Sequence, residues 1–419
     1  MTKEVYVIGS YQGQFKKWAD KSHKDLTREA YLGVLKDVGW DKGDDIQFGW
    51  YSNVSMPTYG QGSIAGQVCM LPLLREGLFP ERVPIINVEG ACASGGIAFL
   101  GAWKDILSGQ CDVSLAIGLE KLYNPQATPE QLFKMFEMGM DVFNPEEWVK
   151  IYEDAAKLVG KEFKRGKDRT VFMDVYAIQA SYHMWKFGTT QRQIACAASK
   201  SHHNGTLNPN AQYRFEVPVE QIMQDREVNY PLTRSMCAPL SDGSAAAILC
   251  SGEYLKNLPS RIQNRAVKVL GVGAAGGKHR SLDEPSCTKF AGERAYKMAG
   301  VGPQDIDLAE VHDAVAFSDL FEAEMLGFCP VGEGGKLAES GETSIEGRIP
   351  LNTSGGLVSK GHPIGATGLS MIYELVTQLR GEAGARQVKN AEIGLADNGG
   401  GSMGFDDATC IVSILQKTN

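Results

Sequence analysis

Apolar and polar positions near the N-terminus predict a strand, a helix and a second strand in succession. Residues 5–8 form a short apolar run that ends at Gly9, residues 29–38 carry apolar side chains at helical spacing up to Gly39, and residues 45–50 again read as a strand. A glycine directly after a helical pattern is typical of a helix C-terminus, because glycine adopts the left-handed backbone conformation without strain. This order of elements is typical of α/β proteins.

The same pattern returns about 260 residues later. A strand is predicted over residues 267–270 before Gly271, a helix over residues 290–299 before Gly300, and a further strand over residues 305–311. The matching glycines lie 262 and 261 residues apart in the two stretches. Chance rarely keeps several elements in register, so we predict two similar α/β halves, each a mixed sheet with crossover helices.

The third repeated unit carries the polar residues. In the first half, an apolar strand enters the small-residue run VEGACASGG at residues 88–96, which opens a helix; in the second half, the run GHPIGATG at residues 361–368 opens a helix in the corresponding place. Cys92 and His362 therefore occupy equivalent turns. If the halves pack about a pseudo-twofold axis, we expect these two turns to face each other.

The two halves differ by one long insertion. Residues 122–235 have no counterpart in the second half, and their aromatic, methionine and charged residues at helical spacing predict a mostly helical cap with loops. The first half would then comprise residues 1–121 and be closed by residues 236–255, and residues 256–419 would form the second half.

Cys92 has the setting of an activated nucleophile. A helix N-terminus points backbone N–H groups at the sulfur and stabilises its thiolate, the nucleophilic form. A buried structural cysteine in a glycine-rich turn is the alternative, and the local sequence favours neither. His362, held between a glycine and a proline, is a candidate base. His312, a loop histidine by its local sequence alone, and the run DNGGG at residues 397–401 are candidate donors to an oxyanion.

This combination suits acyl transfer through a covalent thioester. It does not suit hydride transfer, because no Gly-x-Gly-x-x-Gly run opens a helix, and the chain has no Walker phosphate loop. We predict no metal site: the nine cysteines contain no Cys-x-x-Cys pair, and the adjacent side chains of His202 and His203 would not converge on an ion.

Charge and hydropathy exclude two classes of partner. The net charge is −8 with no basic block, which argues against nucleic acid. The chain contains no run of about 18 apolar residues, so we predict no membrane span. The N-terminus also lacks the apolar region of a signal peptide. Unpaired, scattered cysteines suit a reducing compartment, so we expect a cytoplasmic protein.

Taken together, the motifs resemble those of the thiolase superfamily. The runs CASG at residues 92–95, SDGSAA at residues 241–246, His312-Asp313 and GHPIGATG at residues 361–368 occur in the order of that family and span nearly the whole chain. The His-Asp pair, in place of Asn-Glu, resembles the branch of sterol-carrier-protein-x thiolases and their bacterial and archaeal relatives.

The resemblance implies a five-layered αβαβα thiolase fold, at least a homodimer, and no covalently bound cofactor, with CoA and acyl-CoA as substrates. It implies Cys92 as the acylated nucleophile, His362 as its base and His312 as a donor to one oxyanion. The amides of Cys92 and Gly399 would bind the second oxyanion, and Asn352 and Ser354 are candidate substrate-binding residues. Many relatives pair with a small subunit that contains a zinc ribbon and an OB fold.

Two departures from the family pattern bear on mechanism. The second acid/base cysteine of most thiolases is replaced by Asp397, and the cysteine that often follows the His-Asp pair is Ala314. Either Asp397 replaces the thiol or His362 serves both steps. The expected reaction is thiolysis of a 3-oxoacyl-CoA, including an aromatic or dicarboxylic one such as benzoylsuccinyl-CoA. Alternatives are a condensing synthase or retro-aldolase on the same fold, and a non-catalytic acyl-CoA-binding scaffold subunit.

Overall fold

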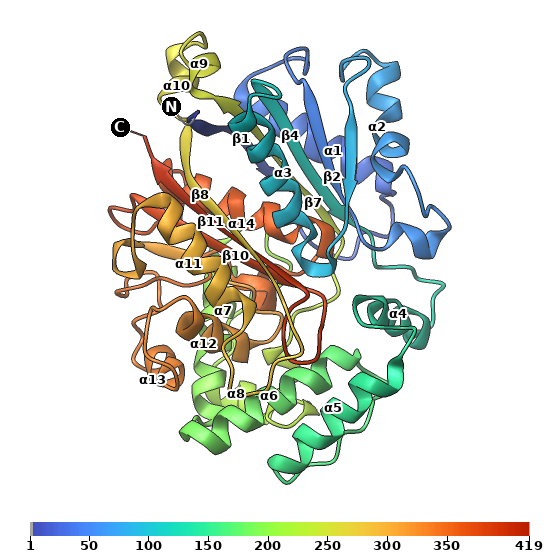
Figure 1. Ribbon diagram of the computed structural model, residues 1–419, viewed down its shortest axis with the longest axis vertical. Coiled ribbons are helices and arrows are strands. Elements are labelled where there is room, and N and C mark those ends of the chain that lie inside the picture. The colour runs from blue at the N-terminus through green and yellow to red at the C-terminus, as the bar shows by residue number, and fades with distance from the viewer. Residues whose placement is uncertain (1–2, 419) are drawn as a thin grey trace.

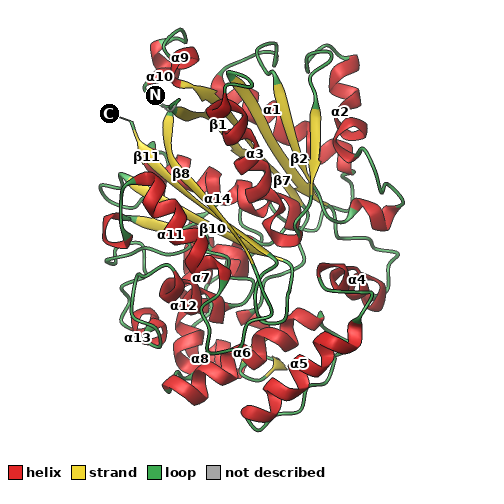
Figure 2. Ribbon diagram, viewed as in Figure 1, coloured by secondary structure: helices red, strands yellow, loops and turns green. Residues whose placement is uncertain are grey.

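The computed structural model describes residues 3–418 and contains two copies of one α/β unit (Figures 1 and 2). The first copy consists of β1 (Val5–Gln12), α1 (His23–Val38), β2 (Phe48–Ser52), α2 (Ala65–Arg75), β3 (Ile85–Val88), α3 (Ser94–Ser108), β4 (Val113–Glu120) and β7 (Gly243–Ser251). The second consists of β8 (Val267–Gly276), α11 (Cys287–Ala299), β9 (Leu308–Glu310), α12 (Ala316–Met325), α14 (Ile364–Leu379), β10 (Ile393–Gly400) and β11 (Thr409–Lys417). The predicted internal repeat is thus confirmed.

The strand order repeats between the halves. The hydrogen-bonded order is β3-β2-β4-β7-β1-β8-β11-β10-β9, so each half runs inward from an outer strand to β1 or β8. These two strands join the halves through an antiparallel pairing of three residues, from Val5 opposite Val269 to Val7 opposite Val267. Where β3 pairs with β2 in the first half, Leu351 forms a single parallel bridge to Ala309 of β9 in the second.

A β-bulge is also repeated. In β1 the register skips Ile8 just before Gly9, and in β8 it skips Leu270 just before Gly271. A side chain at Gly9 would place its Cβ 2.3 Å from Val38, at the end of α1, and one at Gly271 would lie 3.0 Å from Met298 of α11. Both glycines therefore let a helix approach the bulged strand closely.

The helices form three layers around the two half-sheets. Helices α1 and α2 pack on the outer face of the first half-sheet, and α11 and α12 pack on the outer face of the second. Helices α3 and α14 lie between the half-sheets, and their apolar side chains form the central core. This is the αβαβα arrangement of the predicted thiolase fold.

The central helices touch backbone to backbone at their N-terminal ends. A Cβ at Gly368 of α14 would lie 2.3 Å from the amide nitrogen of Gly96, and one at Gly95 would lie 2.8 Å from the amide nitrogen of Gly368. Only glycine fits at this crossing. The contact brings together the turns that precede α3 and α14, which carry Cys92 and His362.

The long excursion between β4 and β7 is mainly helical. It contains α4 (Pro129–Phe136), α5 (Pro145–Leu158), α6 (Val171–Phe187), α7 (Gln191–Leu207), α8 (Val219–Gln224) and a hairpin of β5 (Glu227–Asn229) and β6 (Leu232–Thr233). Helices α5, α6 and α8 lie at the bottom of Figure 1. Apolar residues of α6 and α7 pack against α12 and Val358, so the excursion covers the second half. The remaining short helices are α9 (Gly252–Leu255), α10 (Ser260–Gln263) and α13 (Gly334–Glu339).

Element ends differ from the sequence prediction in two informative places. Helix α1 begins at His23, six residues earlier than its apolar pattern, because Ser22 and Asp25 form a capping box. Residues 397–400, noted in the sequence as part of a glycine run of candidate oxyanion donors, continue β10 and pair with β11. None of the helices in the described part of the chain combines the length and hydropathy that a membrane span requires.

Candidate active site

Cys92 sits on a tight turn between β3 and α3. Ala91, the residue before it, has a left-handed φ of 48°, which is rare for a residue with a side chain. Ser94 holds this turn: its hydroxyl donates to the Ala91 carbonyl at 2.6 Å and accepts from the Gly90 amide at 2.9 Å. The run Cys-Ala-Ser-Gly thus fixes an unusual backbone that presents the cysteine sulfur.

His362 reaches this sulfur from the equivalent turn before α14. Its Nε2 lies 3.2 Å from Sγ of Cys92, and its Nδ1 lies 2.7 Å from the Thr367 hydroxyl. That hydroxyl donates its only proton to the Pro363 carbonyl, so it must accept from Nδ1–H of the imidazole. The proton on Nδ1 leaves a lone pair on Nε2, directed at Cys92, as a general base requires.

Burial keeps this pair neutral at rest. It raises the pKa of the Cys92 thiol to about 12, with the carboxylates of Asp407 and Glu120 adding to the shift. It also lowers the pKa of His362 well below its usual value, helped by His312 and Lys360. The helix N-terminus expected to stabilise a thiolate is therefore outweighed by desolvation, and Cys92 needs a base when it reacts.

His312 completes the group at the carboxyl end of β9. Its ring centroid lies 5.1 Å from that of His362. Asn398 donates one amide hydrogen to the Cys92 carbonyl at 2.9 Å, and the same Nδ2 lies 3.4 Å from Nδ1 of His312. Because the Asn398 amide can only donate, Nδ1 of His312 is the acceptor and the ring proton lies on Nε2, which is the donor. Nε2 has no partner among the described residues, and burial lowers the ring's pKa to about 4, so this donor is neutral and free for a substrate oxygen.

These three side chains line one small cavity of about 80 Å³. Its other walls are mostly apolar and come from α4, α6, the segment before β7, and the β10–β11 hairpin. The remaining lining residues are Phe136, Thr170, Phe172, Met173, Tyr176, Ala238, Pro239, Leu240, Ala314, Gly400, Gly401 and Asp407. The arrangement can hold a short acyl group against the sulfur while it excludes water.

Four other residues predicted for the site lie behind it. Asp397 is buried beneath His312: it accepts from the Cys410 thiol at 3.0 Å, and its other oxygen lies 3.5 Å from the His312 amide. Gly399 pairs with Cys410 inside the sheet. The other two are Asn352 and Ser354. None of these four residues is among those that line the cavity.

Asn352 and Ser354 instead hold the backbone that carries His312. The Asn352 side chain accepts from the Val311 amide at 2.9 Å, and its backbone φ is 55°. The amide and hydroxyl of Ser354 both donate to the buried carboxylate of Glu310, at the end of β9. These bonds tie the segment before α14 to the strand before His312, so both residues position the site from outside the cavity.

Three residues support the site in roles that were not predicted from the sequence. The carboxylate of Glu120, at the end of β4, accepts from the amides of Ser55 and Gly365 and so anchors the start of α14. Asn398 belongs to a run that was noticed for its glycines. Gly400 lies against the cysteine turn, since a Cβ there would be 2.6 Å from the Cys92 amide nitrogen. For Glu120, its position at the end of a predicted strand was the available signal, and for Asn398 and Gly400 it was their place in the glycine run.

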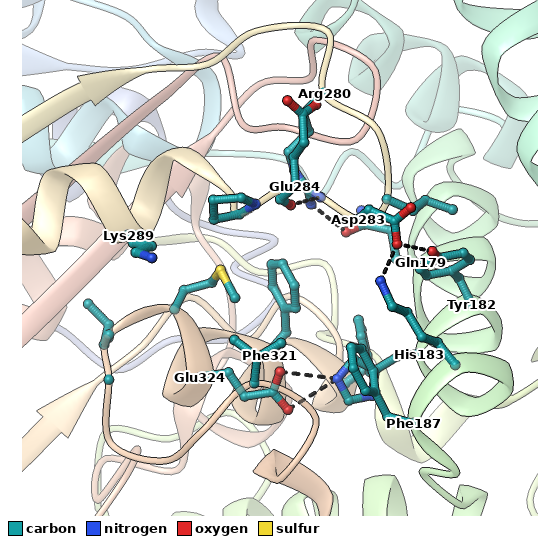
Figure 3. Close-up of a pocket in the computed structure, with 18 of the residues that line it drawn as sticks. Gln179, Tyr182, His183, Phe187, Arg280, Asp283, Glu284, Lys289, Phe321 and Glu324 are labelled. Carbon is teal, nitrogen blue, oxygen red and sulfur yellow. Dashed lines mark hydrogen bonds and ion pairs between the residues drawn. The ribbon is translucent and has the colours of Figure 1, made fainter.

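The remaining histidines of interest have structural partners. His183 bonds Thr189 and Glu324 beside a separate cavity of about 430 Å³ between α6 and α12 (Figure 3). His202 bonds the Ser235 carbonyl, whereas its neighbour His203 pairs with Glu216. Within the described residues, only Cys92, His312 and His362 cluster like metal ligands, with their ligand atoms within 4.8 Å of one another.

Comparison with known proteins identifies the family of this chain. The chain matches the family "Thiolase, N-terminal domain" over residues 5–234 and "Thiolase C-terminal domain-like" over residues 277–414. The chain belongs to the thiolase family. It is 37% identical over 420 residues to an acetyl-CoA acetyltransferase of Methanothermobacter thermautotrophicus, covering 99% of this chain and 100% of the relative. The protein is thus an acyltransferase of the thiolase type.

Two further relatives and one solved structure are similar to the chain. It is 32% identical to sterol carrier protein 2 of Oryctolagus cuniculus, covering 96% of this chain and 73% of that protein. It is 30% identical to the benzoylsuccinyl-CoA thiolase subunit BbsB of Thauera aromatica, covering 93% and 92%. The structure of the Ltp2-ChsH2(DUF35) aldolase superposes with a TM-score of 0.77 at 20% identity, covering 99% and 98%. The predicted likeness to the sterol-carrier branch is confirmed.

Proposed function

We propose that this thiolase-family acyltransferase cleaves a 3-oxoacyl-CoA with CoA through an acyl-Cys92 intermediate, or runs the reverse Claisen condensation. The observation that carries the proposal is the 3.2 Å approach of His362 Nε2 to Cys92 Sγ, with the proton held on Nδ1 by Thr367. Nε2 would take the thiol proton as the sulfur attacks the 3-oxo carbonyl. His312 Nε2–H would donate to an oxygen that becomes negative during the reaction.

The lining of the cavity supports a neutral acyl group on Cys92. Phe136, Phe172 and Tyr176 supply aromatic walls, and no cation is found among the described side chains that line it. A carboxylate on the acyl group would be buried there without a partner, at a cost of several kcal/mol. We therefore favour an acetyl or benzoyl group over a succinyl group at the sulfur. A benzoyl group would agree with the name of the Thauera relative.

A retro-aldolase is the second candidate, since a solved structure with this fold is described as an aldolase. That likeness, at 20% identity, concerns the fold alone. The cysteine–histidine pair supports the thiolase reaction, because a retro-aldol cleavage needs no acyl-enzyme. A condensing synthase would use the same pair in the other direction, and a scaffold subunit would have no need of a fixed tautomer at His362.

We propose at least a homodimer. Among the described residues, the outer strand β3 has one edge without a partner strand, and Ile86 on it is 38% exposed. A small zinc-ribbon and OB-fold subunit is a second proposed partner, which the ChsH2(DUF35) component of the aldolase structure supports. All nine cysteines are free, as suits the reducing cytoplasm that we propose as its compartment.

Covalent loading separates these functions. The purified protein would be incubated with acetyl-, benzoyl- or succinyl-CoA, digested and sequenced by mass spectrometry, then mixed with CoA. We expect an acyl group on Cys92 that CoA releases, and slower loading by at least about a hundredfold in His362→Ala. Cleavage of a β-hydroxyacyl-CoA with no adduct would support the aldolase. Failure of all three acyl donors, alone and with a small partner subunit, would contradict acyl transfer.

A further inference from the structure

The hairpin between β10 and β11 carries a carboxylate into the active site. Asp407 is among the residues that line the cavity with Cys92, His312 and His362. The hairpin is held from behind, because Asp406 accepts from the amides of Cys287 and Lys278, and Arg280 lies 3.6 Å from the same carboxylate. Asp406 is thus anchored away from the cavity. Its neighbour Asp407 is the one of the two acidic residues that lines the cavity.

The glycine run makes room for this carboxylate. A Cβ at Gly399 would lie 2.2 Å from Oδ2 of Asp407, so any other residue there would displace the side chain. On the next residue, a Cβ at Gly400 would strike the amide of Cys92. Gly399 and Gly400 therefore let the end of β10 lie close to Asp407 and to the cysteine turn.

The charges around Asp407 are mainly negative. Asp397 from β10, Asp406 from its own hairpin and Glu322 from α12 lie near enough to interact with its charge, and Arg280 is the cation that does so. Cys92 and Tyr176 line the same cavity, and the Asp407 carboxylate raises the pKa of both. Burial, followed by the carboxylates of Asp397 and Asp406, raises the pKa of Asp407 to about 8. Near neutral pH this group can therefore give and take a proton.

We propose that Asp407 is the second acid/base of the reaction, in the role for which the sequence offered Asp397. The inference rests on the proposed thiolase function and assigns the proton transfers that His362 does not make. Asp407 has access to the cavity, whereas Asp397 lies behind His312 and bonds the thiol of Cys410. Asp397 is then a positioning residue for His312.

The proton balance closes over one turnover. In the first half, Cys92 gives its proton to His362 and attacks the 3-oxo carbonyl; the C2–C3 bond breaks, and Asp407 protonates the C2 carbanion to release an acyl-CoA. In the second half, Asp407 takes the thiol proton of incoming CoA, whose sulfur attacks the acyl group. The Cys92 thiolate leaves and recovers its proton from His362, so both groups return to their starting states.

Proton exchange at C2 isolates this step from acylation. Acetyl-CoA and succinyl-CoA would be incubated with enzyme in D₂O, with loss of the C2 proton signal followed by NMR and Cys92 acylation followed by intact mass. In Asp407→Asn we expect C2 exchange slower by at least about a hundredfold. Acylation by acyl-CoA should slow less, because in that step Asp407 protonates only the weakly basic CoA thiolate that leaves. Asp407→Cys, which restores an acidic group, should recover part of the exchange. The exposed Asp154→Asn is the matched control and should match wild type.

Each outcome decides the assignment. C2 exchange within about threefold of wild type in Asp407→Asn would overturn it, and loss of exchange in Asp397→Asn alone would transfer the role to Asp397. Retained acylation shows that a variant is folded around Cys92. If the wild-type protein itself is not acylated by acetyl-, benzoyl- or succinyl-CoA, the proposed function fails, and this inference fails with it.

Discussion

Nε2 of His362 lies 3.2 Å from Sγ of Cys92, although 270 residues separate them in sequence. Each residue ends the turn before a central helix, one in each half of the molecule. Helices α3 and α14 cross at Gly95, Gly96 and Gly368, and that close crossing sets the distance between the two turns. The internal repeat thus supplies the nucleophile from one copy and its base from the other.

Thr367 should set the efficiency of His362 as a base. Thr367→Val removes the acceptor for Nδ1–H, so the imidazole loses both its orientation and its fixed tautomer. We expect kcat for thiolysis to fall about tenfold or more, with little change in KM, in steady-state assays. Thr367→Ser keeps the hydroxyl and should stay close to wild type. Equal rates for the valine and serine variants would contradict this role.

His312 should make stability depend on pH in a defined direction. Its folded-state pKa of about 4 lies below the ordinary value of 6.5, so the unfolded chain binds the proton first as the pH falls. The stabilisation is complete above about pH 6.5 and is lost as the pH falls towards 4. In urea unfolding at several pH values, the difference in free energy of unfolding between wild type and His312→Asn should shrink across that window. A constant difference would contradict the buried, neutral state.

The sequence predicted the architecture because its signals are local. Gly9 and Gly271 mark the same bulge against a helix in each half, and Gly39 and Gly300 end equivalent helices with left-handed φ values. A turn of small residues around Cys92 can likewise be read directly. Its pairing with His362 was predictable because the repeat relates the two turns.

The supporting groups could not be predicted because they act across the sheet. Ser354 bonds Glu310, 44 residues away, and only the folded chain shows that this bond holds the strand before His312. Asp397 and Asp407 are both acidic residues near one glycine run. Which of them faces the cavity depends on which side of the sheet each β10 side chain points to and on the path of the hairpin. Residues 397–400 lack the apolar pattern of a strand, so the sequence did not predict that β10 extends through them.

Gly400 should be essential to the cysteine turn. Gly400→Ala would place a Cβ 2.2 Å from the Ala93 amide nitrogen and 2.6 Å from that of Cys92, so the turn must shift. Because a displacement of about 1 Å can cost about a hundredfold in rate, we expect Cys92 acylation to slow by that factor in rapid-quench mass measurements. Gly62→Ala, where the added atom meets nothing within 4 Å, is the matched control. Wild-type acylation in Gly400→Ala would contradict the contact.

Metal ions should inhibit rather than support the reaction. The ligand atoms of Cys92, His312 and His362 lie within 4.8 Å of one another, so Zn²⁺ would occupy the nucleophile and its base. We expect EDTA to leave the rate of thiolysis unchanged and micromolar Zn²⁺ to reduce it, with EDTA restoring it. A rate lost to EDTA and restored by Zn²⁺ would instead identify a metal-dependent enzyme.

Intact-mass spectrometry after incubation with acyl-CoA tests the central claim most directly. We expect wild-type protein to gain the mass of one acyl group, located on Cys92, and to lose it when CoA is added. Cys92→Ala should gain no mass and should melt within a few degrees of wild type. Acylation that persists in Cys92→Ala, or thiolysis by that variant at the wild-type rate, would contradict the acyl-cysteine mechanism.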